Sequence, residues 1–168
     1  MELKEAKDHF IQTWGTLGTN WGINRTMAQI HALLLVSNEA LSTEDVMGKL
    51  NISRGNSNMN LRELITWGLV RKEIKPGERK EYFVAEKDMW EVSKCIIRER
   101  KKRELDQIKR TIDHLASVEG DKKDEEYQEF VSLIDDMKNL TTSADKVLNR
   151  LSMAEKNWLL KKFLKMFV

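Results

Sequence analysis

The stretch at residues 50–70, LNISRGNSNMNLRELITWGLV, constrains the fold of this chain more than any other. Ser53 is a good helix N-cap, because its hydroxyl can accept a hydrogen bond from a free backbone N–H of the first turn. Behind it, apolar residues recur at helical spacing and define one stripe: Leu61, Leu64 and Ile65. Gly68 predicts the end of this helix, and the two apolar residues after it predict the start of a strand.

The face of this helix opposite the apolar stripe is unusual for a solvated surface. At about 100° per residue, that face carries the following residues: Asn56, Met59, Asn60, Arg62 and Glu63. A solvated helix would be expected to show pairs of Lys and Glu instead. Asn and Arg offer the planar, bidentate hydrogen-bonding geometry that reads adenine and guanine edges in the major groove. The sequence therefore predicts a recognition helix over residues 54–67.

The flanking segments fit a winged helix-turn-helix. Upstream, Ser42 can cap a short helix, with Asp45 at the spacing of a capping box. Two short helices joined by a tight turn are typical of the helix-turn-helix. Downstream, β-prone segments at residues 72–74 and 82–84 are joined by the basic loop KPGERK at 75–80, in which Pro-Gly predicts a turn. A further short strand is expected at residues 39–41.

Residues 42–84 resemble the winged helix of the MarR superfamily of transcription regulators. Within it, SRGNSNMNLREL followed by WGLV resembles the GbsR-type branch. The resemblance implies a regulator, expected to be a repressor, that binds double-stranded DNA without chemistry. Its recognition helix would enter the major groove, and its wing at 75–80 would reach toward the adjacent minor groove. Some GbsR-type relatives sense choline-like compounds, so the resemblance also implies a small-molecule effector.

The residues expected to contact DNA come from the helix caps, the recognition helix and the wing. They are Ser42, Thr43, Ser53, Arg54, Asn56, Asn58, Met59, Asn60, Arg62, Lys75, Arg79 and Lys80. Arg and Asn side chains on the helix would read bases, while cap and wing residues would hold phosphates. The alternative is a winged-helix module for protein interaction or membrane association that binds no specific DNA.

The N-terminal region completes a DNA-binding domain predicted over residues 1–87. Apolar residues at 3–4 spacing predict an amphipathic helix over residues 2–17, which Gly15, Gly18 and Gly22 are expected to break. Asn24 can then cap a second helix that extends to about residue 36. This second helix is apolar over most of its surface, so it should lie in the middle of the domain.

A helical dimerisation region is predicted over residues 88–168. Asp88 can cap a long helix to about residue 118, with a basic run at 98–104 that is either a solvated surface or a phosphate-contacting one. A turn at 119–126 precedes a second helix, for which a stop and a fresh cap are expected at 141–143. The apolar stripes of the two helices are Leu105, Ile108, Ile112 and Leu115, and Tyr127, Phe130, Ile134 and Met137.

The apolar residues of this region exceed what its own helices need. The tail at 158–168 is also amphipathic, and it could pack on a partner subunit or lie on an anionic membrane. The excess predicts a homodimer. The fold class expected overall is mainly α with a small β-wing: a winged helix-turn-helix followed by long C-terminal dimerisation helices.

Composition narrows the function further. The chain has 168 residues and a formal net charge of only +2, so no general affinity for polyanions is implied. The single Cys95 cannot form an intrachain disulfide, which fits the cytoplasm; it is either a buried small hydrophobe or a redox sensor. The longest aliphatic run, 32–36, is too short to span a membrane. His9, His31 and His114 are scattered and no catalytic motif is present, so we expect no metal, no cofactor and no enzyme activity.

Overall fold

The computed structural model describes residues 1–154, which form helices and one small antiparallel sheet. Contacts divide the chain into two units, Met1–Val92 and a second unit that begins at Ser93, and the helix α5 (Met89–Arg100) contains the division. The predicted boundary after residue 87 lies just before α5. That each part is an independent domain stays a prediction.

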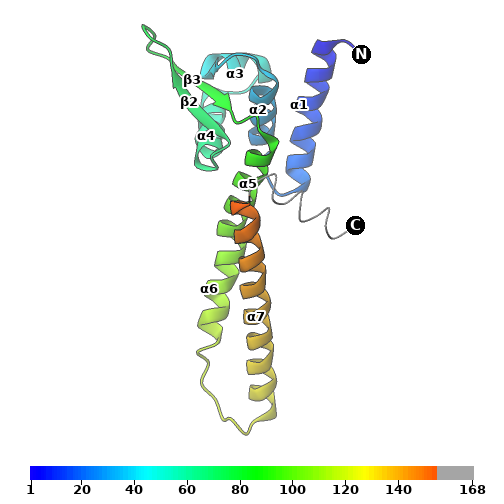
Figure 1. Ribbon diagram of the computed structural model, residues 1–168, viewed down its shortest axis with the longest axis vertical. Helices are drawn as coiled ribbons and strands as arrows, with labels where there is room; N and C mark the ends of the chain where they lie inside the picture. The colour runs from blue at the N-terminus through cyan, green and yellow to red at the C-terminus, as the bar shows by residue number, and fades with distance from the viewer. Residues whose placement is uncertain (155–168) are drawn as a thin grey trace. The chain divides into compact units, whose positions relative to one another are not determined.

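The first unit is built around α2 (Arg25–Val36), which packs along α1 (Leu3–Asn20) (Figure 1). As predicted, Asn24 caps α2: its side-chain oxygen accepts a hydrogen bond from the Met27 backbone N–H at 3.2 Å. The prediction that α2 lies at the centre is also confirmed, because most of its length is buried. Its buried residues are Met27, Ala28, Ile30, His31, Ala32, Leu33 and Leu34.

The expected break of α1 at Gly15 and Gly18 is wrong. Both glycines lie inside the helix and are buried. A Cβ atom at Gly18 would lie 2.6 Å from the Cβ of Ala28 in α2, so glycine allows the two helices to approach closely. The chain turns only after the helix, at Gly22, where φ is +75° and a side chain would be strained.

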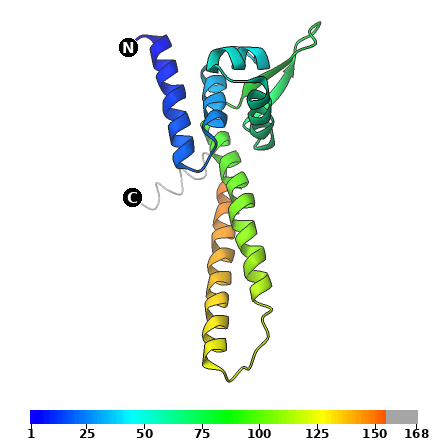
Figure 2. The ribbon, with the colours of Figure 1, turned by 180° about the vertical axis from the view of Figure 1, so that it is seen from behind.

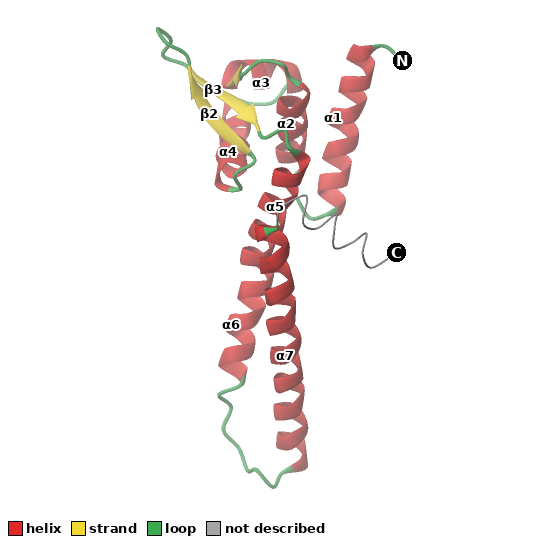
Figure 3. Ribbon diagram, viewed as in Figure 1, coloured by secondary structure: helices red, strands yellow, loops and turns green. Residues whose placement is uncertain are grey.

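The rest of the first unit is a winged helix. It consists of β1 (Leu41–Ser42), α3 (Thr43–Leu50), α4 (Arg54–Thr66), β2 (Val70–Ile74) and β3 (Glu81–Ala85). The strands form an antiparallel sheet in the order β1-β3-β2 (Figure 3). In the β2–β3 hairpin, Val70 pairs with Ala85 and Ile74 with Glu81. The expected fold class, mainly α with a small β-wing, is confirmed.

The second unit contains an antiparallel hairpin of two helical segments (Figure 2). The first segment is the remainder of α5, a π-helical stretch η1 (Lys101–Leu105) and α6 (Asp106–Leu115); the second is α7 (Glu125–Met153). Asp88 caps α5 as predicted, since its side chain accepts from the Trp90 N–H at 2.8 Å. The π-helical stretch was not predicted, and it overlaps the C-terminal part of the basic run.

The expected stop at 141–143 is wrong, because α7 continues through it. Thr141 donates its hydroxyl to the carbonyl oxygen of Met137 at 2.8 Å, so its polar group is satisfied by its own helix. Few residues of the hairpin are fully buried: Ile112 in α6 and Ile134 in α7 are 2% and 4% exposed. Cys95 is 7% exposed, so the expectation that it is buried is confirmed, and its sulfur accepts a hydrogen bond from Arg98 at 3.1 Å.

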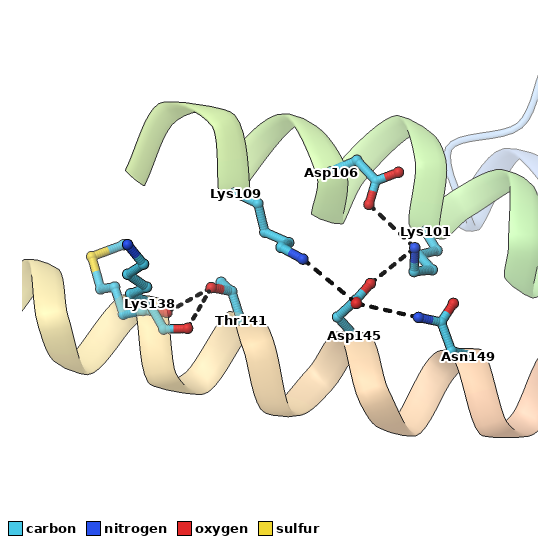
Figure 4. A network of polar contacts seen from close by, with 8 residues as sticks. Lys101, Asp106, Lys109, Lys138, Thr141, Asp145 and Asn149 are labelled. Carbon is cyan, nitrogen blue, oxygen red and sulfur yellow. Dashed lines mark hydrogen bonds and ion pairs between the residues drawn. The ribbon is translucent and has the colours of Figure 1, made fainter. Parts of the chain in front are cut away.

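A polar network joins the two segments of the hairpin (Figure 4). Lys101 forms ion pairs with Asp145 at 2.9 Å and with Asp106 at 3.3 Å, and Lys109 approaches Asp145 at 3.5 Å. Asn149 adds a hydrogen bond to Asp145 at 3.2 Å. The hydrogen bond from Lys101 lowers the pKa of Asp145. The predicted amphipathic tail at 158–168 lies outside the described residues.

Candidate nucleic-acid interface

Both α3 and α4 are capped at their N-termini, and Asn51 and Ser53 form the turn that joins them. Ser42 and Asp45 form the predicted capping box, in which the Ser42 hydroxyl accepts from the Asp45 N–H at 3.2 Å and the Ser42 N–H donates to the carboxylate at 2.9 Å. The hydrogen bonds from Ser42 lower the pKa of Asp45. Ser53 caps α4 by accepting from the Asn56 N–H at 3.3 Å. Between them, Asn51 adopts the left-handed conformation with φ +53°, which asparagine tolerates well.

The capping box corrects the role expected for Ser42. Its side chain is 3% exposed, and its hydroxyl also donates to Asp45 at 2.7 Å. It is therefore not available to hold a phosphate. Thr43 is half-buried, and its hydroxyl donates to the side-chain oxygen of Asn58 across the helix-turn-helix at 3.4 Å. These residues hold the motif together.

The buried face of α4 is wider than its three apolar residues suggest, and it includes Asn60. Ser57 and Asn60 are buried together with Leu61 and Leu64. The Asn60 amide donates to the carbonyl oxygen of Asn56 at 2.8 Å and to its side-chain oxygen at 2.7 Å. The expectation that Asn60 is exposed for base reading is therefore wrong. Asn60 lies about 100° from Leu61 around the helix axis, at the edge of the predicted apolar stripe, and the buried face of α4 extends far enough to include it.

The exposed row of α4 contains Gly55, Met59, Arg62 and Thr66, which recur at spacings of three and four. Met59 is 61% exposed, although it is a large apolar side chain. Within residues 1–154, no hydrogen bond or ion pair holds the side chain of Arg62. Gly55 and Thr66 were not among the predicted site residues. Their spacing from Met59 and Arg62 was the sequence pattern that could have identified them.

Arg54 lies in the first turn of α4 and forms an ion pair with Glu44 of α3 at 2.8 Å. Hydrogen bonds from the Glu44 backbone N–H and from Arg54 lower the pKa of Glu44. The Arg54 side chain is 61% exposed, and the Glu44 side chain is 43% exposed. Because exposed ion pairs contribute little to stability, Arg54 can exchange Glu44 for another anion at little cost.

The wing loop between β2 and β3 is ordered by its own side chains. Gly77 has φ +82°, and the Glu78 N–H donates to the Lys75 carbonyl oxygen at 3.2 Å. The Lys75 ammonium lies 4.0 Å from the centre of the Tyr82 ring, a cation–π contact. Tyr82 donates its hydroxyl to Glu78, and this hydrogen bond raises the Tyr82 pKa. Lys75 is thus partly engaged within the wing.

Two cations of the wing remain outside these contacts. Arg79 and Lys80 are exposed, and no hydrogen bond or ion pair is made by their side chains in the part of the chain that the structure describes. The field of Lys80 reaches α3, where it contributes to lowering the pKa of Glu44 and Asp45. The end of the wing and the start of α3 are therefore electrostatically coupled within this unit.

The first unit thus places the predicted site residues at three levels of exposure. The exposed ones are Ser53, Arg54, Met59, Arg62, Arg79 and Lys80. The half-buried ones are Thr43, Asn56, Asn58 and Lys75, and the buried ones are Ser42 and Asn60. The exposed set carries four cations and one large apolar side chain. Four clustered cations suit a polyanionic partner such as a nucleic acid.

Within residues 1–154, no group of three or more His, Cys, Asp or Glu side chains is placed to hold a metal ion. Over the same range, no helix combines the length and hydropathy needed to cross a membrane.

Comparison with known proteins locates the fold. No protein-family model matches the sequence, and no curated protein matches it significantly. A crystal structure described as that of a transcriptional regulator superposes with a TM-score of 0.58 at 22% sequence identity. The match covers 89% of this chain and 99% of that chain. At this identity the likeness shows a shared fold.

Proposed function

We propose that this chain is a transcription regulator of the MarR superfamily, of the GbsR-type branch, that represses genes by binding specific duplex DNA as a homodimer. The observation that carries the proposal is the exposed row of α4. Among residues 1–154 this row presents Arg62 with no internal partner, in a winged helix that also leaves Arg79 and Lys80 exposed. The likeness in fold to a transcriptional regulator supports the same function.

The exposed residues divide into base readers and phosphate contacts. Arg62 lies in the middle of α4, so its fork of donors can reach the O6 and N7 acceptors of a guanine in the major groove. Arg54 lies in the first turn and can exchange Glu44 for a phosphate, which the helix N-terminus also attracts. Lys80, on the wing, would contact backbone phosphates without reading sequence.

Selection of bound fragments from genomic DNA by the purified full chain tests the proposal. Arg62→Ala should weaken binding to the selected duplex by about 1–3 kcal/mol and relax its specificity. Arg110→Ala is the matched control, because Arg110 is also exposed on a helix but belongs to the second unit. Failure to select any sequence, or equal binding of a scrambled duplex, would contradict specific DNA binding and favour a protein-interaction module.

The salt dependence of binding tests the wing separately. Lys80→Ala should weaken binding to the selected and the scrambled duplex by similar factors, because a phosphate contact carries no sequence information. The slope of log K against log salt concentration should flatten by about one unit. An unchanged slope would remove Lys80 from the interface without affecting the assignment of Arg62.

The homodimer is proposed from a second apolar stripe on α7. The residues of this stripe recur at alternating spacings of three and four: Phe130, Leu133, Met137, Leu140, Ala144 and Val147. Leu133 is 56% exposed, Leu140 71% and Val147 55%, so the stripe lies apart from Ile134, which is buried. A sustained repeat of this kind is the pattern by which helices pair, and a two-fold symmetric dimer would cover it.

Sedimentation at micromolar concentration tests the dimer. The unmutated chain should sediment at twice its mass of 19.7 kDa. Leu140→Asp should shift the equilibrium toward the monomer, because it places a charge in the buried seam. Asn139→Asp is the matched control, since it adds the same charge at an exposed neighbouring position away from the stripe. A monomeric unmutated chain that binds one half-site at full strength would contradict the dimer.

The effector is proposed from the resemblance together with a hollow in the first unit. The hollow has a volume of about 630 Å³ and is lined in part by Lys4, Lys7 and Asp8 of α1, Glu39 and Lys49. Charges of both signs around it suit a small zwitterion. Thermal-shift measurements with choline and betaine, read beside DNA affinity, test this role. If neither compound changes the DNA affinity, these two ligands are excluded as effectors.

A further inference from the structure

The exposed row of α4 contains two residues that the fold itself does not explain. Gly55 is the second residue of α4, in its first turn, and glycine has more backbone freedom to lose in a helix than alanine. Its φ is not in the left-handed region, and a Cβ atom built there meets nothing within 4 Å. Among residues 1–154, no neighbour therefore requires glycine at this position.

Met59 lies one helical turn beyond Gly55 on the same row and is 61% exposed. Its neighbours on the row are Arg62 and Thr66, and the Thr66 hydroxyl donates back to the carbonyl oxygen of Arg62 at 3.1 Å. The N-terminal half of the row, Gly55 and Met59, thus carries no charge. Its one side chain beyond the backbone is the flexible thioether of Met59. Gly55 and Met59 themselves offer a polar base edge no strong side-chain donor or acceptor, although the exposed Ser53 and Arg54 lie beside them at the start of α4.

We propose that Met59 reads the 5-methyl group of thymine in the major groove, and that Gly55 provides the clearance for this approach. This inference rests on the proposed DNA-binding function and names the base that part of α4 selects. Thymine is the base that presents an apolar group in the major groove. The N-terminal part of a recognition helix comes nearest to base edges, which places Gly55 and Met59 ahead of Arg62 in the groove.

Thymine-to-deoxyuridine substitution in the selected duplex tests the proposal, because it removes the methyl group and leaves base pairing intact. With the unmutated full chain, substitution at one or two positions of each half-site should weaken binding about fourfold per methyl, the equivalent of about 0.8 kcal/mol for one buried methyl group. Met59→Ala should weaken binding to the thymine duplex by a similar factor. It should then lose nothing further on the deoxyuridine duplex, since the two changes remove the same contact.

Two matched variants separate this contact from general effects. Met153→Ala removes another strongly exposed methionine, at 81%, and should leave both affinities unchanged. Gly55→Ala and Gly48→Ala each add a methyl group in open space on a helix, and both should raise the melting temperature. Only Gly55→Ala should also weaken binding to the selected duplex, by tenfold or more.

Failure of the inference is distinguishable from failure of the proposed function. If no specific duplex is selected, both are overturned. If a specific duplex is selected but deoxyuridine has no effect at any position, the methyl contact is overturned and DNA binding stands. Additive losses for Met59→Ala and deoxyuridine would likewise overturn it, and normal binding by Gly55→Ala would overturn the role of Gly55.

Discussion

His31 should make the first unit lose stability in mild acid. It lies in α2 with 3% of its surface exposed, and Trp14 of α1 lies against it with 6.3 Å between the ring centres. Burial lowers its pKa from 6.5 to about 4. Since the unfolded chain binds a proton more readily than the folded chain, the stabilising contribution is complete above pH 6.5. It is lost as the pH falls from 6.5 toward 4.

The size of the effect follows from the two pKa values. One unit of pKa difference corresponds to about 1.36 kcal/mol, so the full range is about 3 kcal/mol. Between pH 7.5 and pH 5 only part of this effect is reached, because pH 5 is still above the pKa of His31 in the folded chain. Proton linkage then predicts that the free energy of unfolding falls by about 2 kcal/mol between these two pH values. Urea denaturation followed by circular dichroism at both pH values measures it.

His31→Leu should abolish most of this decrease. At pH 7.5 we expect little change in stability, because the variant also removes Nε2, a buried atom with no hydrogen-bond partner in the described part of the chain. His9→Leu is the control: His9 is exposed on α1, so the decrease should persist in that variant. If His31→Leu still lost about 2 kcal/mol between the two pH values, the assignment of the effect to His31 would be refuted.

Two further predictions concern packing. Gly18→Ala should lower the free energy of unfolding by about 1–3 kcal/mol, because the new Cβ would lie 2.6 Å from the Cβ of Ala28. Gly55→Ala adds a Cβ in open space and should raise the free energy of unfolding. Equal effects of the two variants in urea denaturation would contradict the close contact between α1 and α2. Asp145→Leu should lower the free energy of unfolding by about 1 kcal/mol, because it removes the shorter of the two ion pairs of Lys101 and leaves the one with Asp106. Lys101→Met added to it should restore part of that loss, and additive losses in the double variant would show that the pair is not coupled.

Local sequence patterns were sufficient for the elements whose ends are set by one side chain. Asn24, Ser42, Ser53 and Asp88 each cap the helix that they were predicted to cap, because a cap depends only on the residues one to three positions away. The wing followed from Pro76 and the short β-prone segments on either side of it. The partners in these interactions lie only a few residues apart, so a short stretch of sequence is enough to predict them.

The errors arose where tertiary packing decides between two uses of one residue type. Glycine ends a helix in isolation, yet Gly15 and Gly18 remain helical because α2 needs the space that they leave. Thr141 favours a cap in isolation, yet α7 satisfies its hydroxyl by back-bonding to Met137. For the two glycines the deciding partner is another helix, which a local window does not contain. For Thr141 it is the carbonyl oxygen four residues earlier, a local alternative to capping that the sequence pattern did not distinguish.

The same competition limits what α4 can read. Asn56 and Asn60 have the side chains best suited to adenine, but they hydrogen-bond to each other, and Asn60 is buried. In the proposed complex, base reading by α4 would therefore depend on Arg62, which suits guanine, and on Met59, which suits the methyl group of thymine. A helix with so few readers needs either a second copy of itself or sequence-dependent DNA shape to reach useful specificity. Among residues 1–154, much of the second stripe of α7 is exposed and could contact that second copy. The few base readers of α4 and this exposed stripe therefore both favour the proposed homodimer.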